Sequence, residues 1–243
     1  MTAASLKVSR RHSARTHTGY VRTVNEDAIL VRPDIGLWVV SDGMGGHAAG
    51  DFASQTTIGL LDRIPRHVDD PAEIMQEARH ALHAAHHLIA AEATRRGSGY
   101  IGATVVLLLL SEEHFMCFWV GDSRLYRLRD GVLDMISTDH SFVGELVEKG
   151  FLTWAEAEHH PQANQITRAV GIGDVLEIDK RRGDVRPGDR FLLCSDGLSK
   201  YAGNDLLRRY LMERPVEVLA DELLDVALQG GAIDNISVIV LEA

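Results

Sequence analysis

Three short apolar segments in the middle of the chain constrain its fold most. Residues 103–110, 114–120 and 124–129 follow one another with only turn residues between them, and each has the length and apolar content of a β-strand. Asp130-Gly131 is a typical hairpin turn that leads into a further strand at 132–136. Segments joined this closely predict a sheet of mainly antiparallel strands.

The rest of the chain alternates strand-like segments with longer helical ones. Residues up to 17 are basic and polar and predict a loose arm, with an edge strand near 6–8 as an alternative. Strands interrupted by pairs of helices favour an α+β fold, a sandwich with sheets inside and helices outside. We expect further strands at 36–40, 176–182, 190–194 and 235–242, and helices at 47–61, 72–94, 204–212 and 215–228.

No feature of the sequence divides it into domains. Neither a repeat nor a Pro/Ser-rich linker interrupts the 243 residues, so we expect residues 1–243 to form a single domain. Residues 139–169 differ in character from their surroundings. They are mixed in composition, with helices expected at 141–149 and 154–159, and predict a packed excursion between strands.

The charge balance argues against two classes of partner. The chain has 25 Lys and Arg against 35 Asp and Glu, a net charge of −10, which disfavours nucleic acid and anionic membrane surfaces. The longest apolar run, 104–110, is far too short to span a bilayer, so we expect no membrane insertion. Cys117 and Cys194 both lie in apolar segments, as buried reduced thiols do. These features predict a soluble, cytoplasmic protein.

Four aspartates stand where an apolar strand meets a turn. Each one alone is most often an ordinary turn residue. If the strand ends meet at one edge of the sandwich, they form a strongly negative cleft, which suits a hard divalent cation such as Mg²⁺ or Mn²⁺. Gly43 would let a backbone carbonyl approach such an ion closely. The aspartates are Asp42 after Leu-Trp-Val-Val, Asp122 after Phe-Trp-Val-Gly, Asp196 after Phe-Leu-Leu-Cys, and Asp234 before Asn-Ile-Ser-Val-Ile-Val.

A second group of charged residues lies upstream of these aspartates. Glu26 and Asp27 add acid, and Arg22 adds a fixed cation. Arg22 either neutralises its acidic neighbours or grips a phosphate with its planar fork, and the residues alone leave both interpretations open. The chain lacks the Ser-His-Asp order of a nucleophilic triad, so we favour a metal-activated water as the nucleophile.

Seven motifs, taken together, resemble those of a known family. Their order and spacing, from about residue 19 to residue 241, are similar to those of the metal-dependent protein phosphatases (PPM, protein phosphatase type 2C) in their compact bacterial form. The motifs are VRTVNED (21–27), SDGMGGHAAGD (41–51), GATVV (102–106), VGDSRLYRLRDG (120–131), ITRAVG (166–171), FLLCSDGLS (191–199) and DNISVIV (234–240).

The resemblance implies a fold and a metal site. The fold would be a four-layered α-β-β-α sandwich, with two central, mainly antiparallel sheets flanked by helices. Two Mn²⁺ or Mg²⁺ ions would occupy a cleft at one end of the sheets. Asp42 would bridge both ions, the Gly43 carbonyl and Glu26 would lie on the side of one, and Asp196 and Asp234 would hold the other.

The resemblance also implies an activity, that of a protein serine/threonine phosphatase acting on phosphoserine and phosphothreonine. Arg22 would bind the substrate phosphate, and Asp122 would belong to a third, weaker metal position. Residues 139–169 would form a mobile flap beside the cleft. The substrates would be proteins phosphorylated on Ser or Thr, and the implied partners include a cognate bacterial Ser/Thr kinase.

Two positions depart from the family pattern. Animal members carry a His after the first Asp-Gly that is thought to protonate the leaving group, whereas this chain has Met44, as is common among bacterial relatives. His47 is a nearby substitute, although packing or capping at a helix start is the favoured interpretation. The family usually has an acid four residues after the Asp of Ser-Asp-Gly. Here it is Lys200, whose ammonium would repel a cation, so we predict a weak or absent third ion.

Other functions remain open at this point. One is a catalytically weak, phosphoprotein-binding or scaffold relative of the same fold, and another is a different metal-dependent esterase. The complete set of Arg22, Glu26, Asp42, Asp196 and Asp234 favours the phosphatase, because a binding module has little need of every metal ligand. The histidines at 80, 83, 86 and 87 are interpreted as solvated or packed, since no acid or Cys accompanies them.

Overall fold

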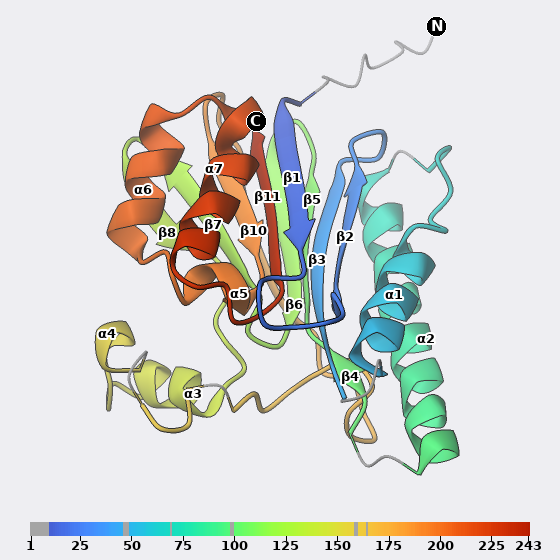
Figure 1. Cartoon of the computed structure of the whole chain (residues 1–243). Coiled ribbons are helices and arrows are strands. Elements are labelled where there is room, and N and C mark those ends of the chain that lie inside the picture. The colour runs from blue at the N-terminus through green and yellow to red at the C-terminus, as the bar shows by residue number, and fades with distance from the viewer. Residues whose placement is uncertain (1–9, 46–48, 69, 98–99, 158–159, 164) are drawn as a thin grey trace, which may run out of the picture.

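Two antiparallel β-sheets packed face to face, with helices on both outer faces, make up the fold (Figure 1). The computed structural model describes residues 10–45, 49–68, 70–97, 100–157, 160–163 and 165–243. The α-β-β-α layering confirms the predicted sandwich. None of the helices in these ranges is long and apolar enough to cross a membrane.

The first sheet contains strands from both ends of the chain. Its order is β1-β11-β10-β7-β8, and every pairing is antiparallel. Its outer face is covered by α6 (Asn204–Glu213) and α7 (Val216–Gln229), whose buried leucines pack on the sheet together with the short helix α5 (Asp196–Ser199). The strands are β1 (His12–His17), β7 (Arg124–Arg129), β8 (Val132–Met135), β10 (Arg190–Cys194) and β11 (Ile236–Glu242).

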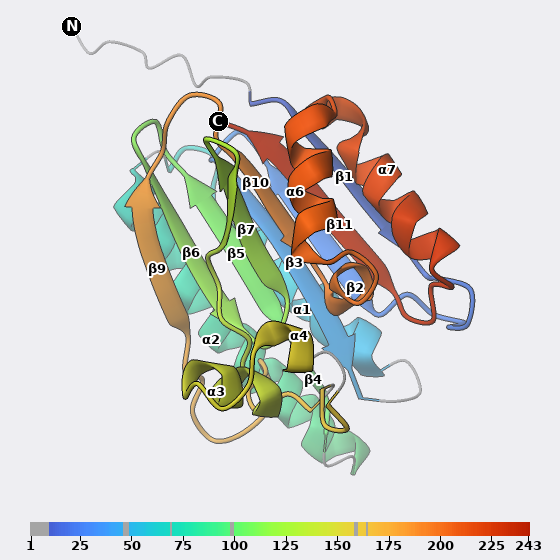
Figure 2. The ribbon, with the colours of Figure 1, turned by 90° about the vertical axis from the view of Figure 1, so that its left-hand side faces the viewer.

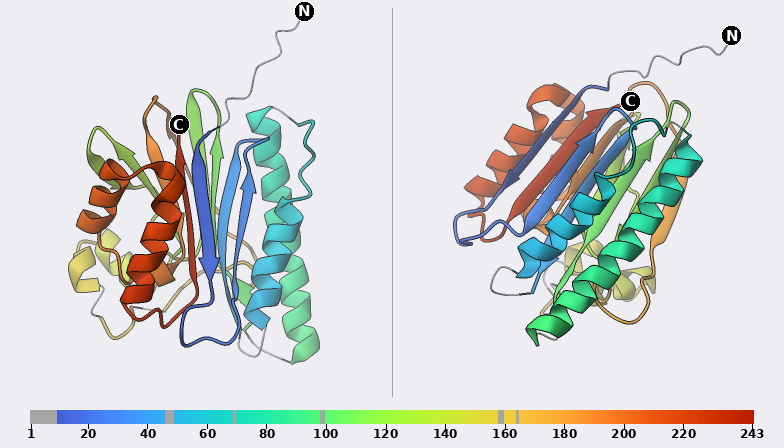
Figure 3. Two further views of the ribbon diagram at one scale, coloured as in Figure 1. Left: turned by 45° about the horizontal axis from the view of Figure 1, so that its top comes forward. Right: turned by 90° about the vertical axis from the view of Figure 1, so that its right-hand side faces the viewer.

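The second sheet has the order β2-β3-β5-β6-β9, with the short strand β4 paired to the end of β3. Helices α1 (Ala49–Leu61) and α2 (Pro71–Arg96) lie across its outer face (Figure 3). Asp70 caps α2 through a hydrogen bond from the Ala72 backbone N–H. The strands are β2 (Asp27–Arg32), β3 (Leu37–Met44), β4 (Gly102–Ala103), β5 (Val105–Leu110), β6 (His114–Val120) and β9 (Asp179–Asp184).

The layer between the sheets is an apolar core built from alternate strand residues. Strand side chains alternate between the two faces, so the same strands supply both this core and the core beneath the helices. Trp38, Leu108 and Phe191 are fully buried in the layer, and the Phe115 and Phe191 rings meet edge to face, 5.4 Å apart. This core fixes how the two sheets sit against each other at the end where the predicted site residues lie.

Residues between β8 and β9 leave the sandwich and return. Helices α3 (Phe142–Glu148) and α4 (Trp154–Ala157) lie at the lower end of the sheets (Figure 2). Ser141 caps α3 by accepting a hydrogen bond from the Gly144 backbone N–H at 3.0 Å. The expected helix at 154–159 is confirmed up to Ala157, and residues 158–159 lie outside the described ranges.

The structure corrects several expected boundaries. The strand expected at 36–40 continues through the Ser-Asp-Gly turn to Met44, because its last residues pair with β4. Residues 12–17, expected in a loose arm, form β1 beside β11. The strand expected at 176–182 begins at Asp179, where it first meets β6. Strand β2 and helix α5 were not predicted, and the edge strand considered near 6–8 lies outside the described residues.

Candidate active site

A cleft of about 350 Å³ lies where strands of both sheets end. Strands β3, β6 and β10 end there, and β11 begins there. Antiparallel pairing accounts for this, because every second strand runs in the same direction and brings its end to the same edge. The cleft is lined by all the residues predicted from the sequence: Arg22, Glu26, Asp42, Gly43, Asp122, Asp196 and Asp234.

Asp42 is held by the strands on either side of it. Its backbone N–H donates to the Thr104 hydroxyl at 3.0 Å, and its carbonyl accepts from the Thr104 N–H at 2.8 Å. Burial raises the pKa of Asp42 well above its ordinary value, and the carboxylates of Asp27, Asp196, Asp122 and Asp234 raise it further. A carboxylate placed in such surroundings is stabilised by a bound cation.

Asp27 belongs to the site although the sequence analysis gave it no specific role. It stands opposite Asp42 in the β2–β3 register, is only 3% exposed, and accepts a hydrogen bond from the Ser195 hydroxyl at 2.8 Å. Its other carboxylate oxygen is buried without a hydrogen-bond partner. Burial raises the pKa of Asp27 to about 7. Alternation along β2 is the signal that places it inward beneath Asp42, but β2 itself was not predicted.

Glycines let the acidic segments approach one another. A Cβ on Gly43 would lie 2.0 Å from the Gly50 carbonyl oxygen, and one on Gly197 would lie 1.9 Å from the Asn235 carbonyl oxygen. The Gly50 backbone N–H, in the first turn of α1, donates to the Glu26 carboxylate at 3.1 Å. Close backbone contact, which no larger residue allows, therefore joins Asp42 to Glu26 and Asp196 to Asp234.

Asn235 is a further residue that the sequence analysis did not single out. Its side-chain oxygen accepts from the Glu26 backbone N–H at 2.8 Å, and its amide donates to the carbonyls of Thr18 and Val24. These hydrogen bonds fasten the loop that carries Arg22 to the start of β11. The Asp-Asn pair at 234–235 was the available signal, since Asn often hydrogen-bonds neighbouring backbone.

Two basic side chains neutralise part of the cleft. A terminal nitrogen of the Arg22 guanidinium donates to one oxygen of Asp234 at 3.1 Å, and its Nε lies 3.0 Å from the other oxygen in an ion pair. The Lys200 Nζ lies 2.6 Å from an Asp196 oxygen and 3.7 Å from an Asp234 oxygen. Burial by itself would lower the pKa of Lys200, but the carboxylates of Asp196, Asp234 and Asp122 together outweigh it and the net shift is upward. Lys200 is therefore charged at neutral pH.

The chemistry of this donor set fits a divalent metal. The ligands available are carboxylates and a sterically open glycine carbonyl, which are the oxygen donors that Mg²⁺ and Mn²⁺ prefer. One carboxylate oxygen of Asp196 and one of Asp27 are buried without a hydrogen-bond donor. These two oxygens are therefore available to a bound cation. Across the described part of the chain, no three His, Cys, Asp or Glu side chains converge tightly enough to define a metal site on their own.

The raised pKa values predict how the metal-free protein responds to pH. Between about pH 4 and pH 8 the folded chain retains protons that the unfolded chain releases, because the pKa of Asp27 is about 7 and that of Asp122 is raised to about 8, mainly by burial. Stability in chelator should therefore fall as pH rises through this range. Carboxylates with a lowered pKa affect stability mainly below this range; an example is Glu92, whose hydrogen bonds from Arg95 and Arg96 lower its pKa to about 2.

Thermal unfolding in EDTA at several pH values checks this expectation. The Tm should decrease from pH 5.5 to pH 8, and Mn²⁺ should raise the Tm more at pH 8 than at pH 5.5. A Tm in EDTA that increases over this range would contradict the assignment of the buried acids.

The residues set aside in the sequence behave as packing or surface groups. His86 is buried and accepts a hydrogen bond from the Gly171 backbone N–H at 3.0 Å, whereas the His80 side chain is 64% exposed. Burial raises the pKa of the Cys194 thiol to about 12, so it is not a nucleophile at neutral pH. Met44 lines the cleft, and His47 lies outside the described residues.

Comparison with known proteins agrees with the motifs. A family model described as "Protein phosphatase 2C" matches residues 16–229. The serine/threonine protein phosphatase PstP of Mycobacterium tuberculosis is 37% identical over 236 residues, covering 96% of this chain and 45% of PstP. The serine/threonine phosphatase stp of Listeria monocytogenes is 32% identical, with 94% of each chain covered. The chain thus spans about half the length of the mycobacterial relative and nearly all of the listerial one.

Solved structures give the same result. The structure described as "PppA, a key regulatory component of T6SS in Pseudomonas aeruginosa" superposes with a TM-score of 0.88 at 45% identity, covering 96% of this chain and 97% of that one. The catalytic domain of PstP in complex with two manganese ions superposes with a TM-score of 0.84 at 35% identity, covering 96% and 97%. The sequence motifs, the sandwich and these matches agree: the chain belongs to the protein phosphatase 2C family.

Proposed function

We propose that this chain is a metal-dependent protein serine/threonine phosphatase. The observation that carries the proposal is the cleft in which Asp42, from one sheet, faces Asp196 and Asp234, from the other, with Arg22 at its rim. In phosphoester hydrolysis water attacks phosphorus, and the bond from phosphorus to the serine or threonine oxygen breaks. The site must therefore stabilise the negative charge of the phosphate and orient it. The names of the relatives support the same activity.

Two divalent ions, Mn²⁺ or Mg²⁺, are the proposed cofactors. Asp42 would contact both ions, with the Gly43 carbonyl and Glu26 on one side and Asp196 and Asp234 on the other. When bound, such ions supply positive charge and a water of lowered pKa at neutral pH. The chain itself contributes the spacing of the ligands, which the close contacts of Gly43 and Gly197 fix.

Arg22 is the proposed phosphate-binding residue. Its guanidinium already pairs with a planar oxyanion, the Asp234 carboxylate. The Arg22 side chain is 49% exposed to solvent, so a substrate can reach it. A phosphate offers the same bidentate geometry. Met44 cannot donate a proton to the leaving oxygen, so no side chain of the described residues is assigned as the general acid.

Lys200 is proposed to weaken or abolish a third metal position next to Asp122. Its ammonium already occupies the space beside Asp196, at 2.6 Å. Replacing it with an acid, Lys200→Asp, should increase the affinity for an additional Mn²⁺, measured as stoichiometry by calorimetry and as an occupied position in crystals grown at high Mn²⁺. Lys149→Asp, at the exposed C-terminal cap of α3, makes the same charge change as a control. An empty position in Lys200→Asp would refute the role of Lys200.

The proposed substrates are proteins phosphorylated on Ser or Thr, and a cognate Ser/Thr kinase is a proposed partner, acting in the cytoplasm. We also propose that the chain forms one domain and that residues 139–169 are a flap beside the cleft. The alternative, a scaffold that binds phosphoproteins without hydrolysing them, is disfavoured because the cleft keeps every predicted ligand.

A phosphate-release assay tests the activity. Phosphoserine and phosphothreonine peptides should be hydrolysed with Mn²⁺, and EDTA should reduce the rate to background until Mn²⁺ is restored. Binding of the peptides without release of phosphate would favour the scaffold. Hydrolysis that persists after complete removal of metal would reject the metal-dependent mechanism.

A further inference from the structure

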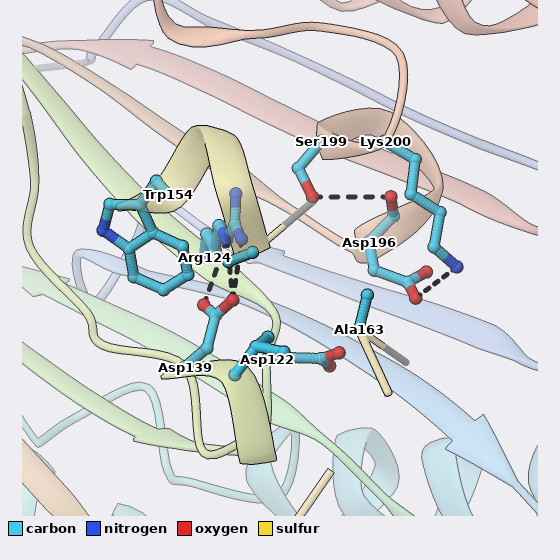
Figure 4. A pocket seen from close by; sticks show the side chains of 10 residues that line it. Asp122, Arg124, Asp139, Trp154, Ala163, Asp196, Ser199 and Lys200 are labelled. Carbon is cyan, nitrogen blue, oxygen red and sulfur yellow. Dashed lines mark hydrogen bonds and ion pairs between the residues drawn. The ribbon is translucent and has the colours of Figure 1, made fainter. Parts of the chain in front are cut away.

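A second cavity, of about 200 Å³, adjoins the catalytic cleft (Figure 4). The two share Asp122, Asp196 and Lys200 as lining residues, so a substrate whose phosphate lies in the cleft can place a neighbouring side chain in this cavity. The space exceeds the roughly 30 Å³ that one water molecule occupies in the liquid and can hold a side chain. We call it the flap pocket, because its far wall comes from Val143, Trp154, Ala157 and Ala163, which lie in the proposed flap.

The far wall of the flap pocket is apolar and is fastened to the core. It is formed by Val143, Trp154, Ala157 and Ala163. The Trp154 ring lies over the Arg124 guanidinium, whose central carbon is 5.0 Å from the ring centroid. This cation–π contact joins α4 to β7 and gives the pocket a defined wall.

The opposite wall carries charge, most of which is already neutralised. Arg124 donates to both oxygens of Asp139, with a shortest distance of 2.7 Å, and Lys200 pairs with Asp196. Asp122 differs from these acids. Within the described ranges its side chain makes no hydrogen bond or ion pair, and Figure 4 shows no dashed line to it. The flap pocket therefore combines an apolar wall with one carboxyl group that no basic side chain of the described residues contacts directly.

We propose that the flap pocket binds a lysine or arginine side chain that lies close to the phosphorylated residue of the substrate. The aliphatic stem would pack on Trp154 and Val143, and the charged head would reach Asp122. A single positive charge beside Asp122 would stabilise the ionised form that burial disfavours, whereas a divalent ion there would leave an excess of positive charge next to the Lys200 ammonium. This inference rests on the proposed phosphatase function and names the substrate class that the function would prefer.

Peptides that differ only in one charge test the inference. A phosphoserine peptide with lysine at each flanking position in turn is compared with its norleucine counterpart, which keeps the stem and lacks the ammonium. At one position or more, kcat/KM should be about tenfold higher for lysine. Asp122→Asn should bring this ratio close to one. The ratio is taken within each variant, so any loss of overall rate in Asp122→Asn does not affect it.

Two further variants keep the test decisive. Ala163→Leu fills the pocket from the flap side and should also reduce the lysine-to-norleucine ratio, without altering any charge. Glu145→Gln removes an acid from α3 whose side chain does not line the pocket, and should leave the ratio unchanged.

The outcomes separate this inference from the proposed function. No Mn²⁺-dependent hydrolysis of any peptide or of p-nitrophenyl phosphate would reject the phosphatase itself. Hydrolysis with a ratio near one at every position would reject the flap pocket alone. A ratio that falls equally in Glu145→Gln and Asp122→Asn would also overturn it, because the preference would then come from the net charge of the protein.

Discussion

Asp42→Asn should reduce phosphopeptide turnover by roughly 10³-fold, the upper end of what loss of one preorganised electrostatic group costs. Four other carboxylates, those of Asp27, Asp196, Asp122 and Asp234, raise the pKa of Asp42, so it lies at the centre of the negative charge that a metal pair would neutralise. Asparagine has nearly the same shape but carries no charge. The measurement is kcat and KM with a phosphoserine peptide at saturating Mn²⁺.

The same substitution should not unfold the protein. In the metal-free state the half-buried Asp42 carboxyl stands opposite Asp27, where its ionised form is disfavoured, and asparagine never ionises, so the Tm of Asp42→Asn in EDTA should equal or exceed that of the wild type. The increase in Tm on adding Mn²⁺ should be lost. Asp225→Asn, on the exposed face of α7, is the matched control and should change neither quantity. Turnover within tenfold of the wild type would remove Asp42 from the centre of the site.

Gly197→Ala should disturb both folding and activity although it adds only one methyl group. The new Cβ would lie 1.9 Å from the Asn235 carbonyl oxygen, which is backbone and cannot rotate away. We expect a loss of about 1–3 kcal/mol in the free energy of unfolding, typical of overpacking in a well-packed core. The added methyl group would push apart the two segments that carry Asp196 and Asp234, so Mn²⁺ affinity and turnover should fall as well.

Gly59→Ala is the control for this prediction. Gly59 lies in α1 with no other atom within 4 Å of a built Cβ. Alanine favours the helix over glycine by roughly 0.5–1 kcal/mol, so this variant should be as stable as the wild type or slightly more so. Denaturant unfolding and Mn²⁺ titration of both variants give the comparison. A Gly197→Ala protein with wild-type stability and metal affinity would show that the contact with Asn235 is not needed.

The sequence predicted the site better than it predicted the strands around it. The aspartates at strand ends are visible because apolar runs and turns mark them locally, and the structure brings Asp42, Asp196 and Asp234 to one cleft. Strand β2 was missed although Asp27–Arg32 has the same length and charged ends as the predicted strand at 124–129, and its place in the sheet is decided by pairing with β3. The burial of Asp27 depends on that pairing, so its role was not visible in the sequence.

Contacts between distant segments were also beyond prediction. The sequence singled out Lys200 as a departure, but its distance from Asp196 depends on the turn of α5. The stacking of Trp154 on Arg124 joins residues whose separation in the chain carries no periodic signal. Composition favours packing for a tryptophan, and only the folded arrangement shows which side chain it packs against.

The cleft draws its acids from two sheets that pack against each other through the apolar layer between them. Asp42 and Glu26 belong to the half of the molecule that contains β2 and β3, and Asp196 and Asp234 belong to the half that contains β10 and β11. The distances between the ligands of a divalent ion bound by both halves would therefore depend on how the two sheets are placed relative to each other. Trp38→Phe or Phe191→Leu, both well away from the acids of the cleft, should alter the preference between Mg²⁺ and Mn²⁺, because the apolar layer sets the spacing of the two sheets.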